Sequence, residues 1–457
     1  MQQKSPGQIS LQDMMRARET RATRQRAMLA RHALPLLSFT LNIPGPVKNN
    51  PLIKEGFAHA LALLDALFER YNIPVLERQI TRAFTGDELL CALKACPLQL
   101  KSLLCGLEGA DAFGRLMDLD VISPEGLRVS RGAAGFPPRA CLLCEHPAGL
   151  CAPSRAHPVE ALFAESQKIL TDALRPARAR HIGRLAQRSL IWEALATPKP
   201  GLVDRNNSGA HQDMTLDTLL DSAAVLGDYF EQSAHCGLLL ASSSPTSVME
   251  ALRPLGLEAE AAMNRATGGV NTHRGAIYAL GILCAAAGRI RENQEPLNAD
   301  TLFDTARGIA AREAERLPQL LAAGETSDGL RQYALIGAGG ARGEAAAGFP
   351  AVHKIALPQL RRYLKEGHGM NDALAFTLIH LIPEVEDSNL LKRAGLRRHQ
   401  ALRRQIQALL SQGPLKLPAL LALDRQFIAE NLSPGGCADL LAAACFAHLL
   451  LDQPTQS

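Results

Sequence analysis

The sequence predicts a multidomain protein, with an α+β domain over residues 1–176 followed by an all-α domain over 177–457. A chain of 457 residues is too long for one ordinary domain. The first part mixes strand-like and helix-like patterns, whereas alanine and leucine recur at helical spacing from about residue 180 onward. The boundary is expected near Pro176, within the arginine-rich stretch 175–184.

The first part predicts helices and strands in turn. A basic amphipathic helix is expected over 10–31, a strand over 36–43, a helix over 53–70 and a strand over 75–81. Residues 115–130 predict a hairpin, because alternating residues are followed by the turn Pro124-Glu125-Gly126.

The second part predicts helices throughout and contains no solenoid-type repeat. Helical spacing of apolar residues begins at Leu216 and continues to Phe230. Further helices are expected over 275–287, 301–317, 371–382, 399–410 and 436–451.

Composition narrows the class of protein. A hydrophobic fraction of 47% supplies buried cores, and a net charge of +4 is small for a nucleic-acid coat protein. No apolar run is long enough to span a bilayer, and the N-terminus lacks the apolar core of a signal peptide, so we expect a cytoplasmic protein with no membrane or nucleic-acid partner. Its ten cysteines are then expected to be thiols or metal ligands.

The loop over residues 198–214 carries the densest polar chemistry. Prolines and glycines keep it out of helix and strand, and its cations, carboxylates and amides suit phosphates, a metal ion and sugar hydroxyls. A solvated connecting loop is the alternative, but the polar residues outnumber what a turn requires. They are Lys199, Asp204, Arg205, Asn206, Asn207, Ser208, His211 and Asp213.

Four more polar clusters punctuate the predicted helices. Taken singly, each has a structural alternative: His273 could be a helix cap and Asp439 could satisfy buried amides. Together they predict helix ends that converge on a polar cavity. The clusters are 269–275 with Asn271, His273 and Arg274; 337–350 with Arg342 and Glu344; 386–389 with Asp387 and Asn389; and 433–436 with Asp439.

These strings resemble one enzyme family. KPGLVDRNNSGAHQDM, GGVNTHRG, GARGEAAAGFP, EDSN and SPGGCADLLA, over roughly residues 180–450, are similar to the triphosphoribosyl-dephospho-CoA synthases. Asp387-Ser388-Asn389 departs mildly from the family's carboxylate-Thr-Asn but keeps the hydroxyl. The resemblance implies that a ribose hydroxyl of 3'-dephospho-CoA attacks the anomeric carbon of ATP and that adenine leaves.

The residue types suit that reaction. Cations can neutralise a triphosphate, carboxylates can hold Mg²⁺ or take the hydroxyl proton, and His211 or His273 could protonate adenine. The catalytic candidates are Asp204, His211, Asp213, His273 and Asp387, with Asp213 also a metal ligand. The binding candidates are Lys199, Arg205, Asn206, Asn207, Asn271, Arg274, Arg342, Glu344 and Asn389.

In the first part, Asp118 and Asp120 form the sharpest motif. Side chains alternate along a strand, so both carboxylates share one face, and two adjacent carboxylates repel unless a cation lies between them. This arrangement carries Mg²⁺ in nucleotidyltransferases, which predicts a nucleotidyltransferase-like fold here. A solvated acidic face of an edge strand is the alternative.

A cysteine cluster follows the acidic pair. Cys141, Cys144, Cys151 and His157 have the residue types of a tetrahedral zinc site. Small, partly buried thiols beside a phosphate-binding loop are an equal alternative, so zinc is predicted only as one of two interpretations.

The first part also carries a resemblance. Arg18-Glu19-Thr20-Arg21 with Gln25, NIPGPVK, GRLMDLDV and GFPPRACLLC, over roughly residues 10–175, are similar to the apo-citrate lyase phosphoribosyl-dephospho-CoA transferases. The resemblance implies transfer of the phosphoribosyl-dephospho-CoA group to a serine of the citrate lyase acyl carrier subunit, with release of pyrophosphate. It implies binding by Arg18, Arg21, Lys48 and Arg139.

The two resemblances support each other, because the product of the second part is the substrate of the first. A chain that makes the prosthetic group from ATP and dephospho-CoA and then attaches it is therefore expected. Two alternatives stay open: maturation of the malonate decarboxylase carrier, which uses the same group, and a zinc-containing nucleic-acid-binding module on a helical scaffold.

Overall fold

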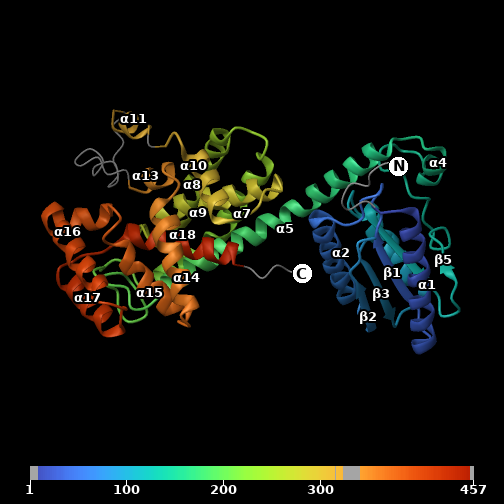
Figure 1. Ribbon diagram of the computed structural model, residues 1–457, viewed down its shortest axis with the longest axis horizontal. Helices are drawn as coiled ribbons and strands as arrows, with labels where there is room; N and C mark the ends of the chain where they lie inside the picture. Colours follow the sequence, from blue (N-terminus) through green and yellow to red (C-terminus); the bar gives the residue numbers. More distant parts are fainter. Residues whose placement is uncertain (1–8, 314, 323–339, 453–457) are drawn as a thin grey trace. The chain divides into compact units, whose positions relative to one another are not determined.

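The computed structural model describes residues 9–313, 315–322 and 340–452. The chain divides into two compact units, residues 1–175 and 176–457 (Figure 1). The boundary lies inside helix α5 (Val159–Leu195), which continues through Pro176. Within the described residues, no helix combines the length and apolar character needed to cross a membrane.

The first unit is built on a five-stranded antiparallel sheet with the order β2-β3-β1-β4-β5. The strands are β1 (Leu36–Leu41), β2 (Val75–Thr81), β3 (Glu88–Leu93), β4 (Met117–Ile122) and β5 (Arg128–Val129). The helices of this unit are α1 (Leu11–His32), α2 (Pro51–Arg70), α3 (Pro97–Glu108) and α4 (Ala148–Ser154), and α5 begins here. The predicted helices, the strand over 75–81 and the hairpin are confirmed, whereas β3 and α3 were not predicted.

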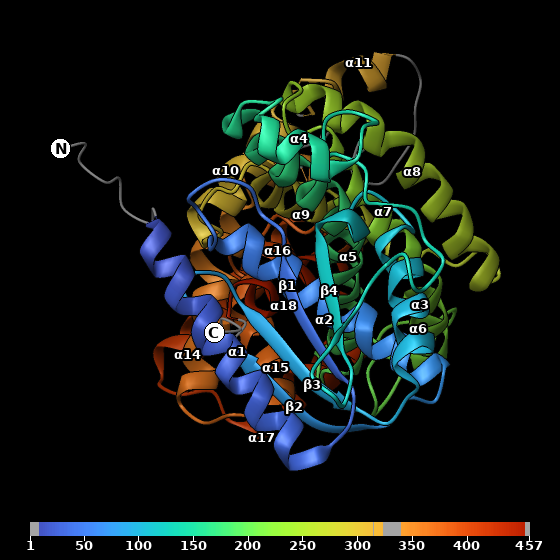
Figure 2. The ribbon, with the colours of Figure 1, turned by 90° about the vertical axis from the view of Figure 1, so that its right-hand side faces the viewer.

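Side-chain alternation gives the sheet two different faces. One face packs against α2, α3 and the start of α5, through Leu37, Phe39, Leu89, Leu119, Val121 and their neighbours. Helix α1 covers the other face (Figure 2). There Met28 packs on Leu36, Leu90, Ala92 and Ile122. Polar residues of the strands at one end of this second face therefore lie beneath α1.

The second unit is helical in every described element. After the end of α5 come α6 (Leu216–Val225), α7 (Gly227–Leu239), α8 (Pro245–Ala266), α9 (Arg274–Glu292), α10 (Ala299–Ala310), α11 (Leu317–Ala322) and α13 (Gly340–Ala346). A π-helical turn (Val352–Ala356) leads into α14 (Leu357–Lys365), α15 (Met370–Leu381), α16 (Ser388–Ser411), α17 (Leu417–Ala429) and α18 (Gly435–Leu451). Helices α9 and α18 are buried along most of their lengths and form the centre of this unit (Figure 1).

Three predicted helices have wrong boundaries. The helix predicted over 399–410 is the second half of α16, which begins at Ser388 and is kinked at Gly395. The apolar spacing from Leu216 to Phe230 spans two helices, because the chain bends at Leu226 between α6 and α7. The helix predicted over 301–317 ends at Ala310. Beyond it, the buried Glu313 accepts a hydrogen bond from Arg253 of α8 at 2.6 Å, so the chain turns inward instead of continuing the helix.

Candidate active sites

Asp118 and Asp120 lie on one face of β4, as the alternation predicts. Met117, Leu119 and Val121 are buried between them on the core face. The pairing with β1 sets Asp118 opposite Thr40 and Asp120 opposite Ser38, on the face that α1 covers. Each carboxylate meets one arginine: Asp120 Oδ2 lies 3.3 Å from Arg128, and Asp118 Oδ1 lies 3.2 Å from Arg139.

A cavity of about 460 Å³ opens beside this acidic pair. It brings together five of the predicted residues, whereas Arg139 reaches the site only through its ion pair with Asp118. Burial lowers the pKa of Lys48, and the charge of Arg18 lowers it further, so these two cations lie close together. The charged residues of the cavity are Arg18, Arg21, Lys48, Arg128, Asp87, Asp118 and Asp120.

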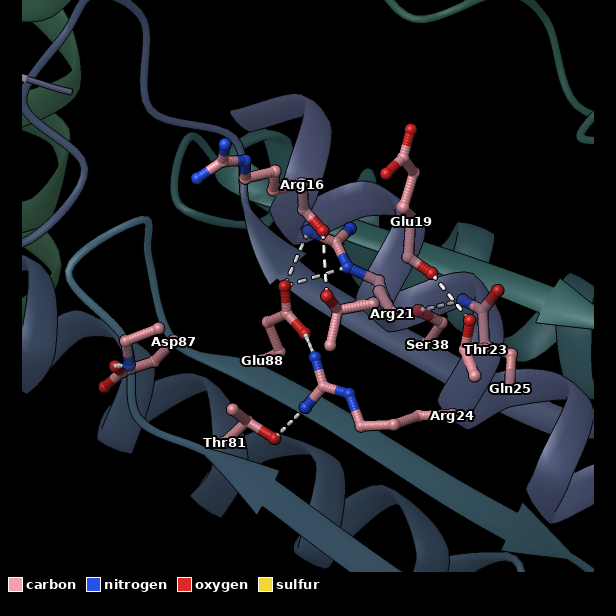
Figure 3. A network of polar contacts seen from close by, with 12 residues as sticks. Arg16, Glu19, Arg21, Thr23, Arg24, Gln25, Ser38, Thr81, Asp87 and Glu88 are labelled. Carbon is pink, nitrogen blue, oxygen red and sulfur yellow. Dashed lines mark hydrogen bonds and ion pairs between the residues drawn. The ribbon is translucent and has the colours of Figure 1, made fainter. Parts of the chain in front are cut away.

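A buried carboxylate holds α1 in place over the sheet (Figure 3). Glu88, at the start of β3, accepts hydrogen bonds from two arginines of α1. Arg21 Nε donates to one carboxylate oxygen at 3.0 Å, and Arg24 Nη2 donates to the other at 2.5 Å. Its side chain is 8% exposed. Gln25 of α1 also donates to Ser38 of β1 at 2.9 Å. These contacts fix the turn of α1 that carries Arg18 and Arg21 toward the cavity.

A second buried carboxylate, Glu108 at the end of α3, holds arginines on the other side of the acidic pair. Its side chain is 1% exposed and forms ion pairs with Arg131 and Arg139. Glu108 Oε1 also accepts the backbone N–H of Leu119 at 3.1 Å. Glu108 therefore ties Arg139 to the strand that carries Asp118, a role that the sequence did not reveal.

The cysteine cluster comes together as a group. The ligand atoms of Cys141, Cys144, Cys151 and His157 all lie within 4.8 Å of one another. The cluster does not line the cavity beside Asp118 and Asp120.

In the second unit, the loop over 198–214 is shaped by its own residues. Gly201 and Gly209 have φ angles of +71° and +57°, and a Cβ at either position would meet backbone atoms within 2.5 Å. The carboxylate of Asp204 accepts the backbone N–H groups of Lys199, Asn206 and Asn207 at 2.7 to 3.2 Å.

The polar side chains of this loop therefore divide into two groups. Lys199, His211 and Asp213 line a cavity, whereas Asp204, Arg205, Asn206 and Asn207 do not. Arg205 donates to Asn371, and Asn207 donates to Asp424 of α17 at 3.0 Å, so both tie the loop to its surroundings.

That cavity has a volume of about 730 Å³ and lies where the helix ends converge. It brings together ten of the predicted residues: Lys199, His211, Asp213, Asn271, His273, Arg274, Arg342, Glu344, Asp387 and Asn389. Asp439 and Ser433 of the last cluster line it too. Residues 337–339 of the glycine-rich cluster lie outside the described residues.

Five charged cavity residues were not singled out in the sequence. Glu193 stands near the end of α5, Glu260 on α8, and Arg393 and Arg403 on α16. Glu384 precedes the Asp387 cluster. None of them belongs to a polar loop motif, so only the folded arrangement of the helices links them to the site.

Carboxylates outnumber cations around this cavity. Eight carboxylates line it: Glu193, Asp213, Glu260, Glu344, Glu384, Glu386, Asp387 and Asp439. Five cations do: Lys199, Arg274, Arg342, Arg393 and Arg403. Burial raises the pKa of Glu344, Asp387 and Asp439, although backbone hydrogen bonds oppose the shift in each case. An anion in this cavity would need further positive charge or protonated carboxyls.

The most buried cation is committed to a partner. Lys199 is 1% exposed, and its ammonium donates to the backbone oxygen and the carboxylate of Glu193 at 2.7 and 2.6 Å. Removing either charge alone would leave the other buried without compensation. The pair therefore fixes the start of the loop against the end of α5.

The two histidines have different environments. Burial, aided by the charge of Lys199, lowers the pKa of His273 to about 3, so its ring is neutral near pH 7. Its Nδ1 contacts Ser222 Oγ at 2.7 Å, and its buried Nε2 has no hydrogen-bond partner within the described part of the chain. His211 is less enclosed, and its Nε2 contacts Ser433 Oγ at 2.8 Å. Burial lowers its pKa, and Arg393 lowers it further.

Asp387 joins two helix N-termini. Its Oδ1 accepts the backbone N–H groups of Asn389 and Leu390 at 2.9 and 3.0 Å, which caps α16. Its Oδ2 accepts the N–H of Cys437, in the first turn of α18, at 2.9 Å. Asp387 thereby sets the spacing between these helices at the cavity wall.

The chain thus has two polar cavities, one in a mixed α+β unit and one in a helical unit, which is the arrangement of an enzyme with two sites for charged substrates. The family model described as ATP:dephospho-CoA triphosphoribosyl transferase matches residues 179–456. The model described as apo-citrate lyase phosphoribosyl-dephospho-CoA transferase matches residues 9–173.

Relatives match both parts. "Protein CitXG" of Haemophilus influenzae is 35% identical over 96% of each chain, and "Protein CitXG" of Leuconostoc mesenteroides subsp. cremoris is 30% identical over 97% of each chain. The 2-(5''-triphosphoribosyl)-3'-dephosphocoenzyme-A synthase of Klebsiella pneumoniae is 41% identical over 60% of this chain and 92% of its own. The chain therefore belongs to the ATP:dephospho-CoA triphosphoribosyl transferase family and, along its whole length, to the family of the fused CitXG proteins.

Proposed function

We propose that this chain makes the prosthetic group of citrate lyase and attaches it. In the first reaction, ATP and 3'-dephospho-CoA give 2'-(5''-triphosphoribosyl)-3'-dephospho-CoA and adenine. In the second, a serine of the apo-citrate lyase acyl carrier subunit takes the phosphoribosyl-dephospho-CoA group, and pyrophosphate leaves. The single observation that carries the proposal is that each family match contains a polar cavity lined by most of the site residues that the sequence predicts for that part of the chain.

We assign synthesis to residues 177–457 and attachment to residues 1–176, the latter with a nucleotidyltransferase-like fold. The antiparallel sheet with a paired-aspartate strand supports that fold. ATP as a substrate and ten free thiols support a cytoplasmic location. The malonate decarboxylase carrier remains the second candidate acceptor, and the match to the citrate-type transferase over residues 9–173 favours the citrate lyase subunit.

The helical cavity fits a magnesium–triphosphate. Arg274 and Arg342 would face the phosphates, but eight carboxylates against five cations would repel a bare triphosphate. Oxygen ligands of this kind suit Mg²⁺, and the side chain of Asp213, which is 65% exposed, is accessible to the ion. Bound Mg²⁺ would supply the missing positive charge.

His273 is neutral near pH 7, so other groups in this cavity would transfer the protons. The attacking ribose hydroxyl must lose a proton and the departing adenine must gain one. An imidazole with a pKa of about 3 is neutral near pH 7 and carries a single N–H. His273 would therefore orient the substrate by donating a hydrogen bond from that N–H. His211 and Asp213 lie 3.7 Å apart in the cavity wall and would exchange protons with the substrate.

The cavity beneath α1 fits the second reaction. Asp118 and Asp120 each use one carboxylate oxygen for an arginine, and their side chains are 43% and 34% exposed. They would hold Mg²⁺, which would offset charge on the triphosphate as pyrophosphate leaves. Arg18, Arg21 and Lys48 would bind the phosphates from the opposite side.

Chromatography of free adenine tests the first reaction. The full chain with ATP should release adenine only when dephospho-CoA is present. The variant Asp213→Asn should lose this release, whereas Asp217→Asn, at an exposed position in the first turn of α6, is the matched control and should keep it. Production of ADP or AMP without adenine would overturn the glycosyl transfer.

A further inference from the structure

The cysteine cluster of the first unit has the geometry of a closed metal site. Cys144 Sγ lies 3.6 Å from Cys151 Sγ and 3.2 Å from the Nε2 of His157, and all four ligand atoms lie within 4.8 Å of one another. Zinc–sulfur bonds of about 2.3 Å in a tetrahedron place neighbouring sulfurs about 3.8 Å apart. We propose that Cys141, Cys144, Cys151 and His157 bind one structural zinc ion, whose loop positions Arg139 at the attachment site.

The alternatives fit the cluster less well. A disulfide needs its sulfurs about 2.05 Å apart, far closer than Cys144 and Cys151. Simple packing of thiols needs an apolar surrounding, but Cys141 is the one buried residue among the described side chains of 131–158. Three thiolates and an imidazole with no open position are typical of a structural zinc site.

The backbone around the cluster is already arranged as a metal-binding knuckle. Ala140 and Pro147 form an antiparallel bridge, and the N–H of Cys141 donates to His146 O at 2.7 Å. This narrow hairpin presents Cys141 and Cys144, and the short helix α4 presents Cys151. A segment with so little apolar burial needs another source of stability, which zinc would provide.

The same hairpin carries Arg139 to the acidic pair. The N–H of Ala148 donates to Arg139 O at 2.7 Å, and Arg115 donates to Ala140 O at 2.8 Å. The guanidinium of Arg139 pairs with Glu108 and, at 3.2 Å, with Asp118. Zinc is thus a positioning element, remote from the reacting atoms; this part of the inference rests on the proposed attachment reaction.

The test uses the full chain purified without a metal-affinity tag under reducing conditions. Mass spectrometry of metals should find about one zinc per chain. After zinc is exchanged for Co²⁺, the absorption bands of tetrahedral cobalt–thiolate should appear. The double variant Cys144→Ser/Cys151→Ser should lose both signals, and the exposed Cys96→Ser, outside the cluster, is the matched control and should keep both.

Measurements of attachment show whether the zinc ion positions Arg139 or is merely bound. The double variant should attach the group to the carrier ten- to a hundredfold more slowly, the usual effect of removing support from a site, while adenine release stays unchanged. Cys151→His, which can still ligate, should retain cobalt bands and recover most attachment. Arg139→Ala should keep zinc and lose attachment.

Two results would overturn the inference. The first is a chain that contains no zinc, shows no tetrahedral cobalt spectrum and still attaches the group at the full rate. The second is a double variant whose zinc loss leaves attachment unchanged, which would remove the positioning role. If zinc is present but the wild-type chain attaches nothing, the proposed function fails and the metal site stands.

Discussion

Replacing Glu88 by glutamine removes the charge that holds α1 on the sheet. Glu88 is 8% exposed and serves Arg21 and Arg24 with its two oxygens (Figure 3). A glutamine keeps one acceptor oxygen, but its NH₂ group would face a guanidinium, donor against donor. Breaking a buried ion pair from one side costs about 3 to 5 kcal/mol. Because both arginines remain about a quarter exposed, at 24% and 23%, we expect the lower end, about 3 kcal/mol.

This loss can be measured as a shift in unfolding temperature. For a unit of this size, 1 kcal/mol corresponds to about 2 to 4 °C, so Glu88→Gln should lower the transition of the first unit by about 6 to 12 °C. Calorimetry of the full chain measures it, and heat inactivation of attachment identifies the transition. Adenine release, which belongs to the other unit, should keep its thermal profile.

Glu77→Gln is the matched control. Glu77 also lies on a strand and also pairs with two residues of α1, Arg31 and His32, but its side chain is 31% exposed. Water and salt replace such contacts readily, so little measurable change is expected. Equal shifts of the transition in the two variants would mean that the buried Glu88 network does not hold α1 on the sheet.

Five further substitutions address the two sites. Asp118→Asn and Asp120→Asn should each slow attachment on the order of a hundredfold or more and spare adenine release. His211→Ala or Asp213→Asn should stop adenine release while supplied intermediate is still attached. His273, with a folded pKa of about 3 and an unfolded pKa near 6.5, binds its proton only when unfolded between these values, so stability should fall as pH drops below about 6.5, and His273→Gln should flatten this slope.

Each of these outcomes has a contrary result. An Asp118 or Asp120 variant that loads the carrier at the normal rate would mean that the pair is a solvated strand face. A loss of both reactions in a His211 variant would point to general unfolding, which circular dichroism would reveal. For His273, the slope is at most about 1.4 kcal/mol per pH unit for one proton, and equal slopes in variant and wild type would contradict the lowered pKa.

Local periodicity predicted where Asp118 and Asp120 lie on their strand. Alternation along 117–122 was enough to set Asp118 and Asp120 on one face and Met117 and Leu119 in the core. The strand Glu88–Leu93 was not predicted, because all six of its residues are buried and its sequence shows no alternation of polar and apolar residues. Glu88 and Glu108 were missed with it, since their partners lie far away in sequence.

The helical site was predictable where polar residues cluster in loops. Lys199, His211, His273 and Asp387 reach the cavity because their loops cap converging helices. Polarity alone did not distinguish residues that line the cavity from residues that shape the loop. Asp204, for example, uses its carboxylate to accept three backbone N–H groups of the loop. The roles assigned to these side chains stay predictions.

Other features depend on contacts between distant segments. Arg393 and Arg403 look like ordinary surface charges of an amphipathic helix until α16 is placed against the cavity. Pro176 cannot donate a helical hydrogen bond, yet α5 continues through it to Leu195. Sequence pattern describes neighbours along the chain, and these outcomes depend on neighbours across it.

The most direct test of the account is the intact mass of the carrier protein. The full chain is incubated with ATP, dephospho-CoA and the apo form of the citrate lyase acyl carrier subunit, with the malonate decarboxylase carrier tested in parallel. The citrate lyase subunit alone should gain the mass of one phosphoribosyl-dephospho-CoA group, and only when both substrates are present. An unmodified citrate lyase subunit, alongside adenine release, or preferential loading of the other carrier would contradict it.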